Sequence, residues 1–161
     1  MDTTTLFSVR GKVAVVTGGS RGIGRMIAEG LVRSGVRVYI SARKADACDA
    51  AASGLSQLGE CISVPADLST RVGVDSLVAA VGEREPSVHL LVNNAGATWG
   101  APLEAFPDDA WDKVLSTNVK AVFDLTVAFL PRMRSAATAD DPARVVNIGS
   151  VDGIRVPATD N

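Results

Sequence analysis

The stretch Thr17-Gly-Gly-Ser-Arg-Gly-Ile-Gly24 decides the fold of this chain. It follows the short apolar run 13–17, which is typical of a strand covered on both faces. After it begins an apolar stripe with helical spacing, made of Ile23, Met26, Ile27, Gly30 and Leu31. The glycines therefore belong to a tight turn from a buried strand into a helix. In a parallel sheet such a turn opens at the carboxyl edge, where α/β proteins bind ligands.

The remaining chain alternates between strand and helix patterns in the same way. Further strands are predicted at 36–40, 61–64, 89–92 and 144–148, and helices at about 48–55, 74–81 and 108–134. This alternation predicts an α/β fold with a doubly wound parallel (Rossmann) sheet of about five strands in the order 3-2-1-4-5. A length of 161 residues fits a single domain, 1–161, and the polar stretch 135–142 indicates a surface connection.

Composition narrows the function classes. A net charge of −2 gives no broad basic field, so neither nucleic acid nor a membrane is expected as a partner. Residues 1–10 lack a sustained apolar run, and no later segment is expected to supply the ~18 apolar residues of a membrane span. Cys48 and Cys61 are interpreted as free thiols, and His89 has no metal-ligating company. The sequence indicates a cytoplasmic protein without a metal site.

The glycine-rich turn predicts a phosphate-binding site. Gly18, Gly22 and Gly24 allow the backbone to approach a pyrophosphate, and the free N–H groups of the following helix attract its charge. The predicted cofactor-binding set also includes the intervening Gly19, Ser20, Arg21 and Ile23. A purely structural turn is the alternative.

The spacing of these glycines resembles the T-G-x-x-x-G-I-G pattern of the short-chain dehydrogenase/reductase family. Asn93-Asn-Ala-Gly96 after the fourth strand and Asp67-Leu68 after the third match further landmarks of that family in order and location. With Asn147-Ile-Gly-Ser150, the similarity covers the chain from Gly11 to about Arg155. The resemblance implies an oxidoreductase that transfers hydride between a nicotinamide cofactor and a carbonyl or secondary alcohol.

Two landmarks are expected to contact the nucleotide. The resemblance implies that Asp67 accepts a hydrogen bond from the adenine amino group, while Leu68 contacts the ring. Asp67 fits equally well as a carboxylate at the start of the following helix. Asn94, Ala95 and Gly96 are expected at the nucleotide as well, although the asparagines of this stretch can also tie down the strand end.

Charge at the end of the second strand indicates NADP(H). The stretch 41–44 has no carboxylate that would repel a 2′-phosphate. Arg43 can pair with that phosphate, and Arg21 offers a second guanidinium. The alternative is that both arginines are merely solvated on the surface.

The long helix carries an amide among apolar residues. Asn118 shares a stripe with Trp111, Leu115 and Leu125, so we expect it to be buried and hydrogen-bonded. The resemblance implies that Asn118 holds a water molecule of the proton relay in the active site. A second apolar set, Val119, Phe123, Val127 and Leu130, indicates a partner helix. The resemblance accordingly implies a homo-oligomer formed through 108–134.

Ser150 is the predicted catalytic residue at the end of the fifth strand. The resemblance implies that this serine orients the substrate oxygen, a tyrosine about a dozen residues later protonates it, and a lysine four residues after the tyrosine lowers its pKa. The chain has one tyrosine, Tyr39, inside the second strand, and no Y-x-x-x-K. The chain is therefore expected to be the N-terminal part of a longer reductase, with its fifth strand left as an unguarded edge.

The substrate expectation is a carbonyl compound, either a small molecule or an acyl thioester. The stretches around 17–31, 93–107 and 143–154 most resemble NADPH-dependent 3-oxoacyl-[acyl-carrier-protein] reductases of fatty acid biosynthesis, including the type associated with rhamnolipid synthesis. Sugar, polyol and steroid dehydrogenases of the family are alternatives. So are a nucleotide-binding or subunit-interaction module without chemistry and a non-functional fragment.

Overall fold

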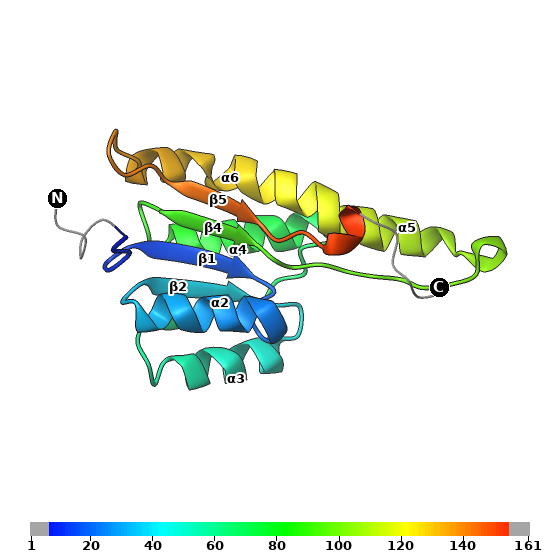
Figure 1. The fold of residues 1–161 in the computed structure, drawn as a ribbon, viewed down its shortest axis with the longest axis horizontal. Helices are drawn as coiled ribbons and strands as arrows, with labels where there is room; N and C mark the ends of the chain where they lie inside the picture. The colour runs from blue at the N-terminus through cyan, green and yellow to red at the C-terminus, as the bar shows by residue number, and fades with distance from the viewer. Residues whose placement is uncertain (1–6, 155–161) are drawn as a thin grey trace.

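The fold is a parallel five-stranded sheet with helices on both faces. It is known from a computed structural model that describes residues 7–154, so both ends of the predicted 1–161 domain, and Arg155 at the end of the predicted family similarity, lie outside the described residues. The strand order β3-β2-β1-β4-β5 is the predicted order. Figure 1 shows the strands with their carboxyl ends on one side of the molecule.

Strands and helices alternate along the chain as predicted. The strands are β1 (Val13–Thr17), β2 (Arg37–Ser41), β3 (Cys61–Ser63), β4 (Leu90–Asn93) and β5 (Arg144–Asn147). The α-helices are α2 (Gly22–Arg33), α3 (Ala45–Leu55), α4 (Arg71–Gly82), α5 (Asp108–Leu115) and α6 (Ala121–Ala136). Observed and predicted strand ends differ by one residue, which is the usual uncertainty of element boundaries.

Two apolar cores lie on the two faces of the sheet. On one face, Val15 and Leu91 of the sheet pack with α4 and α6. On the other face, Val16 and Val92 pack with α2 and α3. Because β1 and β4 are covered on both faces, their side chains are apolar at almost every position.

The buried face of α2 differs from the predicted stripe. Ile23 and Met26 are exposed, and the helix instead buries Gly24, Ala28 and Val32. The small residues allow the helix to lie close to the sheet, so the larger side chains at the start of the helix remain outside. A stripe selected by side-chain size was therefore wrong for the first turn.

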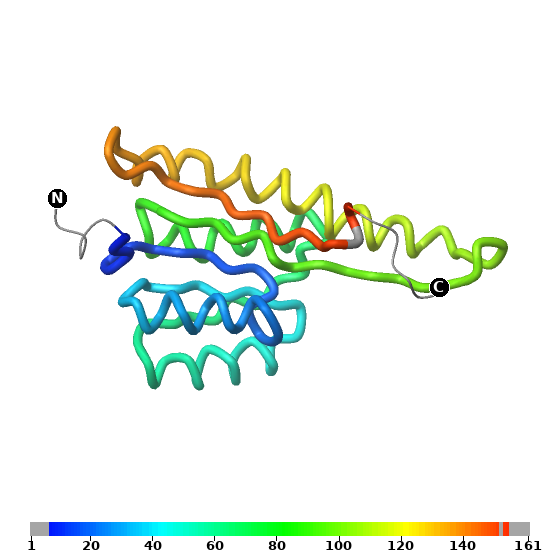
Figure 2. Tube along the Cα trace, in the orientation of Figure 1, coloured from blue at the N-terminus to red at the C-terminus, as the bar shows by residue number. Residues whose placement is uncertain are grey.

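The predicted long helix contains a change of helical type. Between α5 and α6, Ser116–Lys120 forms a π-helical segment. Figure 2 shows the whole helical stretch 108–136 running without a break from beyond the strand ends to beside the sheet. The wider π turn shifts the helical phase, so α6 buries Ala121, Leu125, Phe129 and Met133, while Trp111 and Leu115 of α5 remain exposed.

The helical stretch 108–136 also passes the length and hydropathy criteria for a membrane span. It has 29 residues and a mean hydropathy of 1.3 over its most apolar window. This corrects the expectation that no segment would qualify. The same criteria are met by helices that pack in proteins without membrane spans, and α6 contributes to the core described above.

The fifth strand forms an edge of the sheet, as predicted. All four residues of β5 are exposed, including Val145 and Val146. The predicted free thiols are also confirmed, because Cys48 and Cys61 are both buried and unlinked. Burial raises the pKa of the Cys61 thiol to about 11, so it remains protonated at neutral pH.

Candidate functional site

The glycine-rich turn lies at the carboxyl edge of the sheet between β1 and α2 (Figure 1). Gly18 and Gly22 have positive φ angles, 68° and 54°, which a glycine adopts at little cost. Arg21, Gly22 and Ile23 are exposed there, so a ligand can reach the backbone. At Gly22 an added Cβ would meet nothing within 4 Å.

The start of α2 can receive an anion. Arg21 is the residue before the helix and makes no capping hydrogen bond with its side chain. The first turn of α2 holds no acidic residue, so the positive end of the helix dipole is not neutralised locally. Together with the open space over Gly22, these features fit a bound pyrophosphate.

Thr17 and Asn94 lock the two strand ends of the site together. The Thr17 hydroxyl donates to the carbonyl of Val92 and accepts from the backbone N–H groups of Asn94 and Ala95, at 3.0 Å each. The Asn94 amide donates in return to the carbonyl of Thr17 at 2.9 Å and of Gly18 at 3.4 Å. The glycine turn and the segment after β4 therefore form one unit.

Thr17 is the functional position that the sequence reasoning missed. Its hydroxyl bonds to a strand 75 residues away, and no local pattern encodes that pairing. Its position as the last residue of a buried strand was the available signal, since a buried hydroxyl must find hydrogen-bond partners.

Replacing Thr17 by valine tests this connection. Val keeps the shape but removes the acceptor of two backbone N–H groups, so we expect the free energy of unfolding to fall by about 2 kcal/mol. Urea unfolding followed by circular dichroism measures the change. Thr17→Ser retains the hydroxyl and is the control; equal stability of the two variants would contradict this role.

The end of β2 lies beside the same glycine turn. Gly19 donates its N–H to the carbonyl of Ser41 at 3.1 Å, and an added Cβ on Gly19 would collide with Ile40. Arg43, two residues beyond β2, is exposed on this side. Arg43 and the glycine turn are thus neighbouring parts of one edge. Ser20, half-buried, lies within that turn.

Asp67 and Leu68 lie between β3 and α4. The Asp67 carboxylate accepts from the Ser69 hydroxyl at 2.7 Å and from its N–H at 3.1 Å. The cap of α4 is Thr70, whose hydroxyl accepts from Gly73, so Asp67 is not the capping residue. Leu68 is buried in the core that includes residues of α4 and α6, and its expected contact with an adenine ring stays a prediction.

Asn118 holds the chain that follows Gly96. Its amide oxygen accepts from the Ala97 N–H and its amide nitrogen donates to the Ala97 carbonyl, at 2.8 Å each. The side chain is exposed, which corrects the predicted burial. The π-helical segment carries Asn118 beyond the sheet, where no core covers it. The predicted need for hydrogen-bond partners is met by backbone groups.

Ser150 lies just after β5, at the carboxyl edge. It is exposed, and its carbonyl accepts from Gly153 in a short turn at Val151–Gly153. Tyr39 does not present its hydroxyl at this edge. The hydroxyl donates instead to Glu85, at the amino side of the sheet, at 2.7 Å. Burial and Glu85 raise the pKa of Tyr39 to about 12. Within residues 7–154, the carboxyl edge therefore holds Ser150 but no tyrosine.

No metal-binding group of three or more His, Cys, Asp or Glu residues occurs within residues 7–154. The site instead consists of a glycine turn, a helix start, arginines and amides. Such a strand-turn-helix edge defines a dinucleotide-binding protein of the Rossmann class.

The chain belongs to the short-chain dehydrogenase family, whose sequence profile matches residues 12–159. It is 52% identical over 148 residues to the rhamnolipids biosynthesis 3-oxoacyl-[acyl-carrier-protein] reductase of Pseudomonas aeruginosa, covering 92% of this chain and 58% of the relative. It is 40% identical to the gluconate 5-dehydrogenase of Gluconobacter oxydans, covering 91% and 56%. The chain thus spans a little over half the length of these relatives.

Solved structures agree with this assignment. The Pseudomonas aeruginosa RhlG/NADP active-site complex has a TM-score of 0.91 and 50% identity, covering 96% of this chain and 60% of that one. L-Sorbose reductase of Gluconobacter frateurii, complexed with NADPH and L-sorbose, has a TM-score of 0.87 and 29% identity, covering 94% and 57%.

Proposed function

We propose that this chain binds NADP(H) and supplies the cofactor half of a carbonyl reductase. The observation that carries the proposal is the single unit formed by the glycine turn, the uncapped start of α2 and Asn94. NADP complexes among similar structures and a 3-oxoacyl-[acyl-carrier-protein] reductase among the relatives support it. The cytoplasm is the compartment that suits such an enzyme.

The chain's own residues divide into binding and orienting roles. The turn from Gly18 to Gly24 and the start of α2 bind the pyrophosphate, and Arg21 and Arg43 bind the 2′-phosphate. Asp67 is retained as the adenine partner, while Asn94, Ala95 and Gly96 shape the floor beneath the cofactor. When bound, NADPH supplies a hydride. Ser150 orients the substrate oxygen by a hydrogen bond, and Asn118 fixes the adjacent loop.

We further propose a 3-oxoacyl thioester as substrate of the whole protein. The 52% identity to a reductase of that description supports this choice over a sugar or polyol.

For the 161-residue chain we expect saturable NADPH binding with almost no reduction of an acetoacetyl thioester, because a missing general acid costs about 10²–10⁴ in rate. Turnover at ordinary enzymatic rates would overturn the assigned roles. The alternative is a binding module without chemistry, and it is supported by the position of Tyr39, whose hydroxyl bonds to Glu85 away from the nucleotide edge. This alternative would be favoured if a chain extended to include a Y-x-x-x-K segment stayed inactive.

Self-association through α5 and α6 belongs to the same proposal. Their outward face carries exposed apolar side chains at Trp111, Leu115, Val119, Phe123 and Val127. These side chains lie outside the core that α6 forms with the sheet, and we expect a second copy of the chain to cover them.

Arg43 should determine the cofactor preference. Arg43→Ala removes a charge-assisted bond, so we expect NADPH affinity to fall by about 1.5–3 kcal/mol while NADH affinity changes little. Fluorescence titrations of the folded chain with each cofactor measure this. Arg33→Ala is the matched control, since Arg33 lies at the other end of α2 and pairs with Glu29. Equal affinities of the unmodified chain for NADPH and NADH would overturn the NADP(H) assignment.

A further inference from the structure

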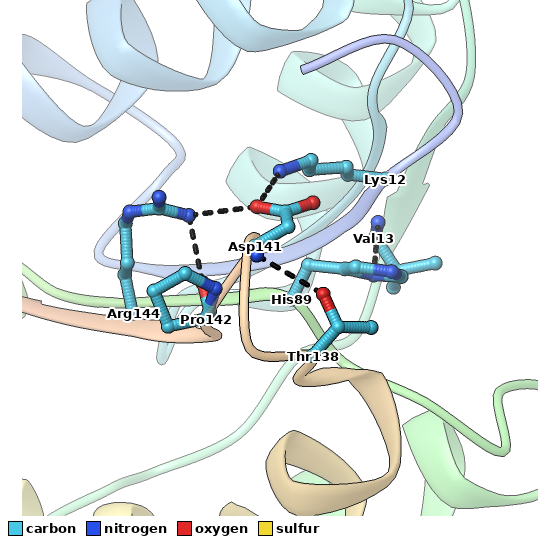
Figure 3. A network of polar contacts seen from close by, with 7 residues as sticks. All are labelled: Lys12, Val13, His89, Thr138, Asp141, Pro142 and Arg144. Carbon is cyan, nitrogen blue, oxygen red and sulfur yellow. Dashed lines mark hydrogen bonds and ion pairs between the residues drawn. The ribbon is translucent and has the colours of Figure 1, made fainter. Parts of the chain in front are cut away.

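The amino edge of the sheet, opposite the nucleotide site, has a cluster of polar contacts around Asp141, and beside it a hydrogen bond between His89 and Val13. Figure 3 shows His89 beside Val13, with Asp141 between Lys12 and Arg144. The Asp141 carboxylate contacts Lys12 at 2.6 Å and Arg144 at 3.2 Å. Its backbone N–H donates to the Thr138 hydroxyl at 3.0 Å. The network therefore fixes the loop between α6 and β5 to the start of β1.

His89 itself joins three strands. Its N–H donates to the Val13 carbonyl and its carbonyl accepts from the Arg144 N–H, at 2.9 Å each. Its side-chain Nδ1 accepts from the Val13 N–H at 3.1 Å. An imidazole that accepts at Nδ1 must be neutral, with its proton on Nε2. The imidazole thus supplies an acceptor to a strand N–H at the sheet margin.

We propose that His89 is an acid-sensitive latch, whose protonation removes the side-chain acceptor of the Val13 N–H and so loosens the start of β1 from the start of β4. A proton on Nδ1 would face the Val13 N–H, so two donors would meet where one hydrogen bond existed. This device is independent of the proposed cofactor binding.

The surrounding charges agree with a neutral histidine. Burial and the Lys12 ammonium lower the pKa of His89, and these effects outweigh the opposing influence of Asp141 and Glu85. Arg144 adds a further cation that pairs with Asp141. The pKa of Asp141 is itself lowered by hydrogen bonds from Lys12 and Arg144, so its own contribution is lost only at much lower pH.

The sign of the pH effect follows from proton binding. Below about pH 6.5 the unfolded or opened histidine takes up a proton that the closed latch rejects. The equilibrium constant for opening should then rise by up to about tenfold per pH unit until the folded histidine also titrates. The closed state is fully favoured above pH 6.5.

The chain contains a single histidine, which makes the test direct. We expect NMR to show its imidazole titrating below 6.5, and the amide protection factor of Val13 to fall by up to about tenfold between pH 7.5 and 5.5. His89→Asn, which keeps an acceptor near Nδ1 but does not titrate, should keep its protection at both pH values. His89→Phe should show low protection at both.

Two results would overturn the latch: a histidine pKa at or above 6.5 in the folded chain, or the same loss of protection at pH 5.5 in His89→Asn. If His89→Phe fails to fold, the comparison of the unmodified chain with His89→Asn still decides the matter.

Discussion

Gly24→Ala is expected to abolish measurable NADPH binding and to destabilise the fold. Gly24 is buried in the first turn of α2, and an added Cβ would lie well inside contact distance of the Asn94 amide and the Gly18 carbonyl. Asn94 is held by Thr17 and cannot move aside without breaking the bonds between the ends of β1 and β4. We expect a loss of about 3 kcal/mol in unfolding free energy, at the upper end for overpacking.

Gly30→Ala is the matched control on the same helix. An added Cβ at Gly30 would meet nothing within 4 Å. Alanine in a helix interior is more favourable than glycine, so this variant should gain about 0.5–1 kcal/mol. NADPH titration and urea unfolding measure both variants. If Gly24→Ala bound NADPH as tightly as Gly30→Ala, the close packing of the glycine turn against Asn94 would not contribute to NADPH binding.

Phe129→Ala should cause the largest loss of stability among core substitutions in α6. Its side chain is fully buried between α4 and the sheet, with Leu77 and Leu91 in the same core. Removing a buried phenylalanine leaves a cavity, and we expect a cost of about 3–5 kcal/mol. Thermal and urea unfolding at low protein concentration measure the effect apart from self-association.

Phe123→Ala separates the two faces of the same helix. Phe123 is 67% exposed, so its removal should change the free energy of unfolding by no more than about 0.5 kcal/mol. It should instead weaken self-association, which analytical ultracentrifugation measures. A similar loss of stability in both variants would contradict the assignment of buried and outward faces, and unchanged association in Phe123→Ala would argue against an interface on this helix.

Several features of the site were predictable because they depend on local spacing. The glycine turn needs only a strand before it and a helix after it, and both were visible in residues 13–31. Asn94 follows its strand by one residue, and parallel strands bring such positions to one edge. These positions are confirmed, whereas their roles toward the cofactor remain predictions.

Other features depended on contacts that periodicity does not encode. Asn118 was expected to be buried and is exposed, because the π-helical segment carries it beyond the sheet. The burial of the Leu68 side chain, about which no local pattern made a prediction, depends on how α4 and α6 meet. A count of 3.6 residues per turn continues through Asn118 without registering that wider turn. The hydrogen bonds from Ala95 to Thr17 and from Val13 to His89 join positions 78 and 76 residues apart.

The sequence by itself determined the strand order, the nucleotide edge and the family of this protein, because buried parallel strands and glycine turns impose strict local patterns. Tertiary structure alone decided which side chains are buried and which hydroxyl, amide or imidazole completes a distant strand's hydrogen bonding. The physical reason is that burial and hydrogen-bond satisfaction belong to pairs of surfaces, and a pattern along one chain segment describes only one surface of each pair.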